Sequence, residues 1–440
     1  MNNNQDGLLR KDGVSLLVPF VMLTCCFALW GFANDVTNPM VQSYSTIFQK
    51  SNLEGSLVQV AFYMGYFLMA FPAAMFIQKY SFKAGVLMGL TLYAIGALAF
   101  LPARVTGIYY TFLLAYFVMT CGLSFLETSC NPYIYCLGSE DTATQRLNFA
   151  QAFNPIGAVS GTIVAGLFVQ TQLDPTDSPT RHQLLTENPA LFESIKDHDL
   201  GVLIQPYVYI GIVVLMLLVA IRLTRMPKAS DGGSNKSLFT AIRELCHVKN
   251  YREGVIAQFF YVGAQVTCWT YIMHYGHELF CVRGGMAERA ASTLSFRYYI
   301  GALVLFTLGR FICTYFLKYI KPGRLLAILA VAAMACLVGV VFFNDIKGMI
   351  CLVAVSGCMS LMFPTIYGIA LKGLGENVKF GGAGLIMSIL GGSVLPPIQA
   401  AIMDTGREFF GISAVHASFL VPFISFIVVA IYGRRTAHKA

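Results

Sequence analysis

Long apolar stretches recur along the whole sequence, and this recurrence limits what the chain can fold into. Of its 440 residues, 56% are hydrophobic and only 12% are charged, whereas a soluble globular chain carries about 25% charged residues. A helix needs about 20 apolar residues to cross the hydrocarbon core of a bilayer. Because no stretch alternates as a strand would, we predict an all-α polytopic membrane protein with twelve transmembrane helices. The predicted spans are 15–45, 55–78, 84–102, 108–137, 147–170, 202–224, 254–280, 292–318, 324–343, 348–372, 380–403 and 413–433.

The charges between these spans predict the orientation of the chain. With Met1 placed in the cytoplasm, the inner loops and termini hold more than twice as many Lys and Arg residues as the outer loops. Positive charge accumulates on the cytoplasmic side, so both termini are expected to be cytoplasmic. We expect a multi-pass protein of a plasma membrane or a bacterial inner membrane. The net charge of +8 then follows from topology, and we expect no nucleic-acid partner.

Similar segments suggest that the chain contains two copies of one unit. The only two tryptophans of the sequence, Trp30 and Trp269, fall in the first and seventh spans. Residues 131–135 (NPYIY) in the fourth span resemble residues 363–367 (FPTIY) in the tenth span. Parallel repeats of this kind are typical of alternating-access transporters with a substrate site between the halves near the midplane. The predicted parts are an N-terminal six-helix half at 1–224, a cytoplasmic linker at 225–253 and a C-terminal six-helix half at 254–440.

Two carboxylic acids lie deep inside predicted spans, Asp35 in the first and Glu127 in the fourth. A charge at the bilayer centre costs at least ~2.5–3.5 kcal/mol, so such residues are usually functional. A carboxyl group that changes its protonation state near neutral pH can carry a proton. We therefore predict that both acids take part in proton coupling. The alternative is that each is a packing group paired with a neighbouring helix.

Amide and aromatic side chains gather around these acids and on two further spans. Amides both donate and accept hydrogen bonds, which suits hydroxyl groups, and flat rings can cover the apolar face of a sugar. The alternatives are hydrogen bonds between helices for the amides and ordinary packing for the rings, which include Tyr66, Tyr133 and Tyr367. The predicted substrate-binding residues are Trp30, Asn34, Asn38, Tyr63, Asn131, Gln151, Asn154, Gln258, Tyr261, Gln265 and Trp269.

Other chemistries find little support in the sequence. There is no G-x-x-x-x-G-K-[ST] loop, so ATP is not the evident energy source, and we expect a proton gradient and no cofactor. We also expect no metal site, because His274, His277 and Glu278 end a span where solvated histidines are ordinary. Arg310 is interpreted as a gate or loop salt-bridge residue. The long outer loop at 171–201 is interpreted as a surface lid or a disordered connection.

Several segments carry a resemblance to a known family that covers nearly the whole chain. They include 27–34 (FALWGFAN), 61–67 (AFYMGYF), 122–128 (GLSFLET), 146–151 (RLNFAQ) and 258–265 (QFFYVGAQ). Through them the sequence resembles the major facilitator superfamily and, within it, the fucose–galactose–glucose proton symporters. The resemblance implies a proton-linked carboxylate at Glu127 and sugar contacts at Asn131, Gln151 and Asn154.

One position departs from the pattern of this family. The family carries an essential aspartate in the first span where this chain has Asn38, whereas the aspartate here is Asp35. A shift of three residues moves a side chain by about 4.5 Å along a helix and about 60° around it. Asp35 could therefore serve the same cavity.

The sequence thus predicts a secondary active transporter, not an enzyme, for proton-coupled uptake of a neutral monosaccharide by alternating access. L-fucose is the leading substrate. The alternatives are a symporter or facilitator of the same fold for glucose, galactose or N-acetylglucosamine, while a membrane enzyme or a sugar sensor is disfavoured. The expected partners are the sugar, the proton and membrane lipid, and we expect the chain to function as a monomer.

Overall fold

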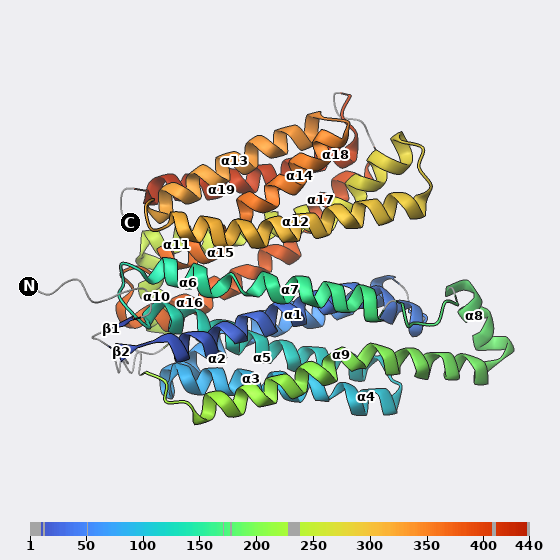
Figure 1. The fold of residues 1–440 in the computed structure, drawn as a ribbon, viewed down its shortest axis with the longest axis horizontal. Coiled ribbons are helices and arrows are strands. Elements are labelled where there is room, and N and C mark those ends of the chain that lie inside the picture. The colour runs from blue at the N-terminus through green and yellow to red at the C-terminus, as the bar shows by residue number, and fades with distance from the viewer. Residues whose placement is uncertain are drawn as a thin grey trace, which may run out of the picture. The chain divides into compact units, whose positions relative to one another are not determined.

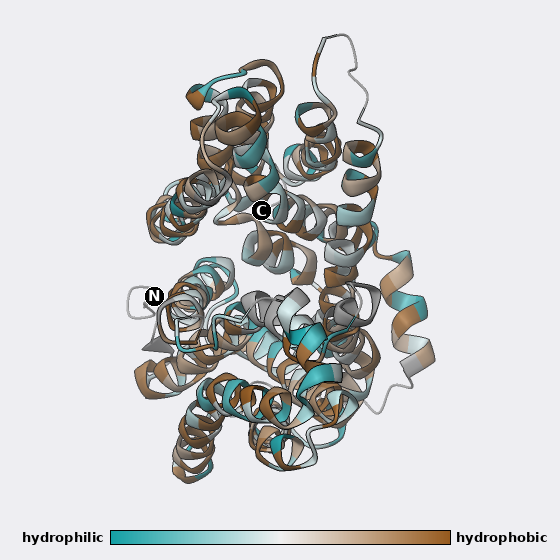
Figure 2. Cartoon of the chain, turned by 90° about the vertical axis from the view of Figure 1, so that its right-hand side faces the viewer, coloured by the Kyte–Doolittle hydropathy of each residue, from teal (hydrophilic) through white to brown (hydrophobic). Residues whose placement is uncertain are grey.

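The computed structural model describes residues 10–11, 14–50, 52–169, 171–176, 178–227, 238–406 and 411–437, and these are helical almost throughout (Figure 1). A short antiparallel hairpin, formed by β1 (Arg10–Lys11) and β2 (Val14–Ser15), precedes the first helix. Hydrophobic residues run along the helices (Figure 2). Within the described residues, ten helical stretches are long and apolar enough to cross a membrane.

The helices fall into two series along the chain. The first series is α1 (Leu17–Ile47), α2 (Asn52–Lys79), α3 (Phe82–Leu98), α4 (Phe100–Thr106), α5 (Tyr109–Cys136), α6 (Ala143–Gln151), α7 (Asn154–Ile163), the π-helical turn η1 (Val164–Val169), α8 (Ser178–Glu187) and α9 (Pro189–Leu223). The second series is α10 (Leu238–His247), α11 (Lys249–Gly276), η2 (His277–Arg283), α12 (Glu288–Phe316), α13 (Pro322–Phe342), α14 (Ile346–Met359), α15 (Met362–Leu371), η3 (Gly375–Asn377), α16 (Val378–Met387), η4 (Ser388–Leu390), α17 (Gly391–Asp404), α18 (Ala414–Ser418) and α19 (Leu420–Thr436).

Two of the twelve predicted spans are not among the ten apolar stretches. The fifth span is interrupted between α6 and α7, at Ala152 and Phe153. The seventh span, α11, is one unbroken helix whose glutamines and tyrosines lower its mean hydropathy. Both spans carry predicted substrate ligands, so the polar residues that make them candidates for binding also weaken their apolar signal.

The described chain divides into two compact units. One holds Leu16–Tyr133 together with α7, α8 and α9, and the other holds Ile134–Ala152 together with α10 to α19. We call Ile134–Ala152 the elbow. It runs from the last residues of α5 through α6. It is tied to the later helices by Asn148, whose Nδ2 donates to the Thr365 hydroxyl over 3.2 Å. The predicted boundaries of the six-helix halves stay a prediction.

The predicted linker at 225–253 contains α10 and the first residues of α11. Its residues 228–237 lie outside the described part of the chain. At the other end of α9, the outer segment 171–201 was expected to be a lid or a disordered connection. Disorder is the wrong expectation for its described residues, because α8 and the first turns of α9 fold there. Arg181 and Asp199 form an ion pair of 2.6 Å in which both side chains are buried.

Close helix packing in the first unit depends on small residues. A Cβ atom at Gly31 of α1 would lie 2.0 Å from the backbone oxygen of Asn154, and one at Gly157 of α7 would lie 1.8 Å from that of Ala28. Without side chains at these two positions the backbones of α1 and α7 can meet, as is common between membrane helices. This contact fixes the part of α1 that carries Trp30 and Asn34.

Candidate functional site

The acid buried within the membrane spans of the first unit is Glu127, which is 1% exposed. It lies on α5 next to Tyr66 of α2, and the two side chains interact electrostatically. Trp30 of α1 also interacts with Tyr66. Glu127 Oε2, the Tyr66 hydroxyl and Trp30 Nε1 are all buried without a well-formed hydrogen bond to a described residue. Three helices therefore bring a carboxyl, a phenol and an indole together with hydrogen-bonding capacity to spare.

The second acid, Asp35, is half-buried on α1. It interacts electrostatically with Tyr63, which precedes Tyr66 by three residues on α2. Residues three apart lie on one helix face, so a single face of α2 serves both acids. Asn34, beside Asp35, keeps its buried Oδ1 without a described hydrogen-bond partner. The side chain of Asn38 lies outside the part that the structure describes.

Asn131 and Asn154 use part of their hydrogen-bonding capacity within the first unit. The Asn131 side chain is fully buried, and its Nδ2 donates to the backbone oxygen of Glu127 over 3.0 Å. Asn154 begins α7 and donates from Nδ2 to the Phe27 backbone oxygen over 3.2 Å. In each case one amide donor is used for helix contact, so the packing role and the predicted sugar contact are both compatible with the structure.

In the second unit, Gln258 of α11 stands apart from the other amides. It is 0% exposed, and neither its Nε2 nor its Oε1 has a hydrogen-bond partner among the described residues. A buried amide without partners costs about 1–3 kcal/mol. Gln265 lies two turns further along the same helix and is half-buried. Gln258 is thus the amide whose position is hardest to explain by packing alone.

Two aromatic candidates on α11 are held by hydrogen bonds inside the second unit. The Tyr261 hydroxyl donates to the Met359 backbone oxygen over 3.1 Å. Trp269 Nε1 donates to the Ser356 hydroxyl over 3.1 Å, and its ring meets Phe306 edge-on with centroids 5.0 Å apart. These contacts position both rings and occupy the indole N–H and the phenol proton. A sugar can still meet the faces of both rings, and the Tyr261 oxygen can still accept a hydrogen bond.

Gln151 is buried at the end of α6, and its backbone oxygen accepts a hydrogen bond of 2.9 Å from Arg310. Arg310 is 3% exposed and donates from Nε to the Ser360 backbone oxygen. Its guanidinium lies over the Phe306 ring, 4.6 Å from the centroid. The interpretation of Arg310 as a salt-bridge residue is wrong for the described chain, in which its partners are neutral oxygens and an aromatic ring.

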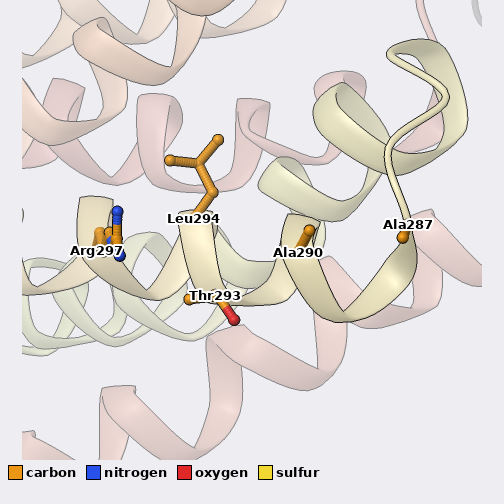
Figure 3. A pocket seen from close by; sticks show the side chains of 5 residues that line it. All are labelled: Ala287, Ala290, Thr293, Leu294 and Arg297. Carbon is orange, nitrogen blue, oxygen red and sulfur yellow. The ribbon is translucent and has the colours of Figure 1, made fainter.

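A hollow of about 490 Å³ opens at the first turns of α12, lined by Ala287, Ala290, Thr293, Leu294 and Arg297 (Figure 3). Its one charged lining residue is Arg297, which is exposed. None of the predicted ligands lines this hollow, so we do not assign it to the sugar. Glu278, which the sequence places near His274 and His277 at the end of the seventh span, pairs with Arg283 at 3.0 Å.

Sequence reasoning left out two residues of the site. Tyr66 stood among the accompanying rings, although its spacing from Tyr63 could have placed both on the face that serves the acids. Arg310 was considered only as a gate or loop salt-bridge residue near the inner end of the eighth span. The available signal was a proline four residues after each of its two carbonyl partners, at Pro155 and Pro364.

Comparison with known proteins gives consistent matches over nearly the full length. The family model described as Major Facilitator Superfamily matches residues 23–396. The L-fucose-proton symporter of Haemophilus influenzae is 46% identical, covering 95% of this chain and 96% of the relative. The L-fucose-proton symporter of Escherichia coli is 33% identical, covering 97% and 94%.

A solved structure is similar over the same length. It is the crystal structure of FucP, described as a Major Facilitator Superfamily transporter in the outward conformation. It matches with a TM-score of 0.85 and 32% sequence identity, and the match covers 95% of this chain and 98% of that one. The agreement extends through both helical series.

Proposed function

The chain belongs to the Major Facilitator Superfamily, and we propose that it takes up a neutral monosaccharide, L-fucose foremost, together with a proton. The fold of this family is twelve transmembrane helices in two six-helix halves. The interrupted fifth span and the polar α11 complete that number beside the ten apolar stretches. Transport by this fold proceeds by alternating access of one substrate site to the two sides of the membrane.

The observation that carries the proton coupling is the environment of Glu127. The carboxyl is buried in a membrane helix, one oxygen has no described hydrogen-bond partner, and the interacting side chain is a neutral phenol. An ionised carboxylate without a countercharge is costly in such a place. Glu127 is therefore suited to bind a proton when it is buried and to release it when the cavity opens to water. Asp35 is the second candidate, served by the same face of α2 through Tyr63.

The sugar site is proposed from the amides and rings that retain binding capacity. In the first unit these are Trp30 Nε1 and Asn34 Oδ1, and in the second unit both polar atoms of Gln258. Each of these atoms can pair with a hydroxyl group of a neutral sugar. The relatives from Haemophilus influenzae and Escherichia coli are both named L-fucose-proton symporters. Their names support L-fucose over the alternative sugars.

The chain is a multi-pass membrane protein, and we propose a bacterial inner membrane with both termini in the cytoplasm. The excess of Lys and Arg in the loops assigned to the inner side supports this orientation. We further propose that one chain suffices for transport, since each predicted site residue comes from a single copy. The proton gradient supplies the energy.

Purified protein in liposomes with an imposed inward proton gradient tests this function. Labelled L-fucose should accumulate above its external concentration, and a protonophore should abolish the accumulation. Unlabelled D-galactose, D-glucose and N-acetylglucosamine should compete less well than unlabelled L-fucose. Better competition by another sugar would reassign the substrate, and sugar flux that never exceeds equilibrium would show a facilitator.

A further inference from the structure

Resting on the proposed function, we propose that Arg310 is a positioning residue of the sugar site that holds two proline-broken helices by the backbone carbonyls at their ends. The unusual feature is a guanidinium buried in a membrane span with no carboxylate beside it among the described residues. An unpaired buried charge is strongly destabilising. Its retention needs another source of negative potential.

Two helix ends supply that potential. Gln151 is the last residue of α6, and Ser360 caps the end of α14. The last carbonyls of a helix lack internal donors and carry the negative end of its dipole. Arg310 donates to the backbone oxygens of both residues. It thus acts as a shared cap for two helix C-termini.

The sequence explains why these two carbonyls accept from a side chain and not from the regular backbone donor. In a continuous helix each carbonyl accepts from the N–H four residues later. Four residues after Gln151 stands Pro155, and four residues after Ser360 stands Pro364. Proline has no N–H, so neither carbonyl can receive its regular bond. The planar guanidinium replaces both missing donors at once, because its N–H groups point in different fixed directions. A lysine ammonium is a compact charge and cannot reproduce this geometry.

This cap reaches two proposed sugar ligands. One is Gln151 itself, whose backbone is held directly. The other is Trp269, which meets the edge of Phe306 while Arg310 lies over that ring. A cation–π contact of this kind is stronger when it is removed from water, as it is here. Arg310 therefore fixes the end of the elbow and the indole of α11 without touching the substrate.

The test compares Arg310→Lys and Arg310→Gln with Arg297→Lys, an exposed arginine on the same helix. Both Arg310 variants should raise the KM for L-fucose counterflow by about tenfold, as for one lost charge-assisted bond, with a smaller change in maximal rate. Arg297→Lys should leave KM unchanged. Restoration of KM by lysine would show that charge alone matters and would overturn the proposal, as would an unchanged KM in both variants.

A second substitution supplies a rescue that general destabilisation does not predict. Pro364→Ala restores the N–H that the Ser360 carbonyl lacks, so it should recover part of the KM lost in Arg310→Gln. Should Arg310 variants fail to fold, Phe306→Leu tests the same chain of contacts with the guanidinium in place, and it should raise KM about threefold. No recovery by Pro364→Ala in a folded double variant, or an unaltered KM in Phe306→Leu, would count against the shared cap.

A measurement without sugar separates this proposal from the proposed function. In a Trp30→Phe background the only remaining tryptophan is Trp269. Its emission should change in Arg310→Lys, in which the Phe306 ring loses the guanidinium over it, and in Phe306→Leu, in which the ring is removed. It should not change in Arg297→Lys. If the parent protein fails to bind L-fucose, the proposed substrate is wrong while this emission change still supports the positioning. An unchanged emission in folded variants overturns it.

Discussion

Glu127 of the first unit is buried with no cation beside it among the described residues, whereas Arg310 of the second unit is buried with no described carboxylate beside it. Glu127 interacts with the phenol of Tyr66, and Arg310 bonds to the backbone oxygens of Gln151 and Ser360. Among the described residues, the buried carboxylates lie in the first unit and none lies in the second. A carboxyl can lose its charge by binding a proton, but a guanidinium stays charged. The difference supports the proposal that proton exchange takes place in the first unit and that Arg310 serves as a fixed scaffold in the second.

The largest effect should come from Glu127→Gln, which keeps the size of the side chain but cannot exchange a proton. Gradient-driven accumulation of L-fucose should fall to the equilibrium level, while counterflow, which needs no net proton movement, should persist at least in part. Uptake and counterflow in the same liposomes measure both. Glu193→Gln, at an exposed glutamate that pairs with Lys196, serves as the control. Normal uphill uptake by Glu127→Gln would remove this residue from coupling.

The next effect sharpens the assignment within the first unit and concerns Asp35→Asn. If Asp35 replaces the acid that the family carries at Asn38, this change should abolish or uncouple uptake. Adding Asn38→Asp should then restore part of it. Asn38→Asp alone should impair transport, because two carboxylates about 5–6 Å apart repel each other. Transport by Asp35→Asn with an unaltered pH profile would leave Asp35 a packing residue.

A smaller and opposite pair of effects tests the second unit through Gln258→Leu. Removing a buried amide that has no partner should raise the thermal unfolding temperature, since its burial costs about 1–3 kcal/mol. The same change should weaken L-fucose binding about tenfold if the amide bonds to the sugar. Gln399→Leu is the matched control, because Gln399 is equally buried but donates to Ser418 over 3.1 Å. It should lose stability and keep its affinity. Unchanged affinity in Gln258→Leu would make Gln258 a packing residue.

The fold could be predicted from local sequence, and the positions of the two acids proposed for proton coupling could be identified in the same way. Span length and loop charge indicate the helices, and Asp35 or Glu127 stands out in an apolar stretch without reference to any neighbour. The role of Arg310 could not be predicted in this way, since its partners are backbone carbonyls whose availability depends on prolines far along the chain. The order in segment 171–201 was missed for a similar reason. It depends on the ion pair between Arg181 of α8 and Asp199 of α9, which are 18 residues apart in the sequence.

The smallest effects come from the two tryptophans, which differ in how their indole N–H groups are used. Trp30 Nε1 is buried near the Tyr66 hydroxyl without a well-formed hydrogen bond to a described residue, whereas Trp269 Nε1 donates to Ser356. Phenylalanine keeps a flat ring and removes only the donor. Trp30→Phe should therefore weaken L-fucose binding about fivefold, the loss of roughly one hydrogen bond of about 1 kcal/mol. Trp269→Phe should leave a buried hydroxyl unpaired, so it should mainly lower the thermal unfolding temperature.

Calorimetric titration and thermal unfolding of both variants separate affinity from stability. Ser356→Ala in the Trp269→Phe background is the control, because it removes the hydroxyl left without a donor and should recover part of the lost stability. A larger loss of affinity in Trp269→Phe than in Trp30→Phe would reverse the comparison. The second unit would then contact the sugar through a polar group that the structure shows bonded within the protein, and Ser356 would have to release it when the sugar binds.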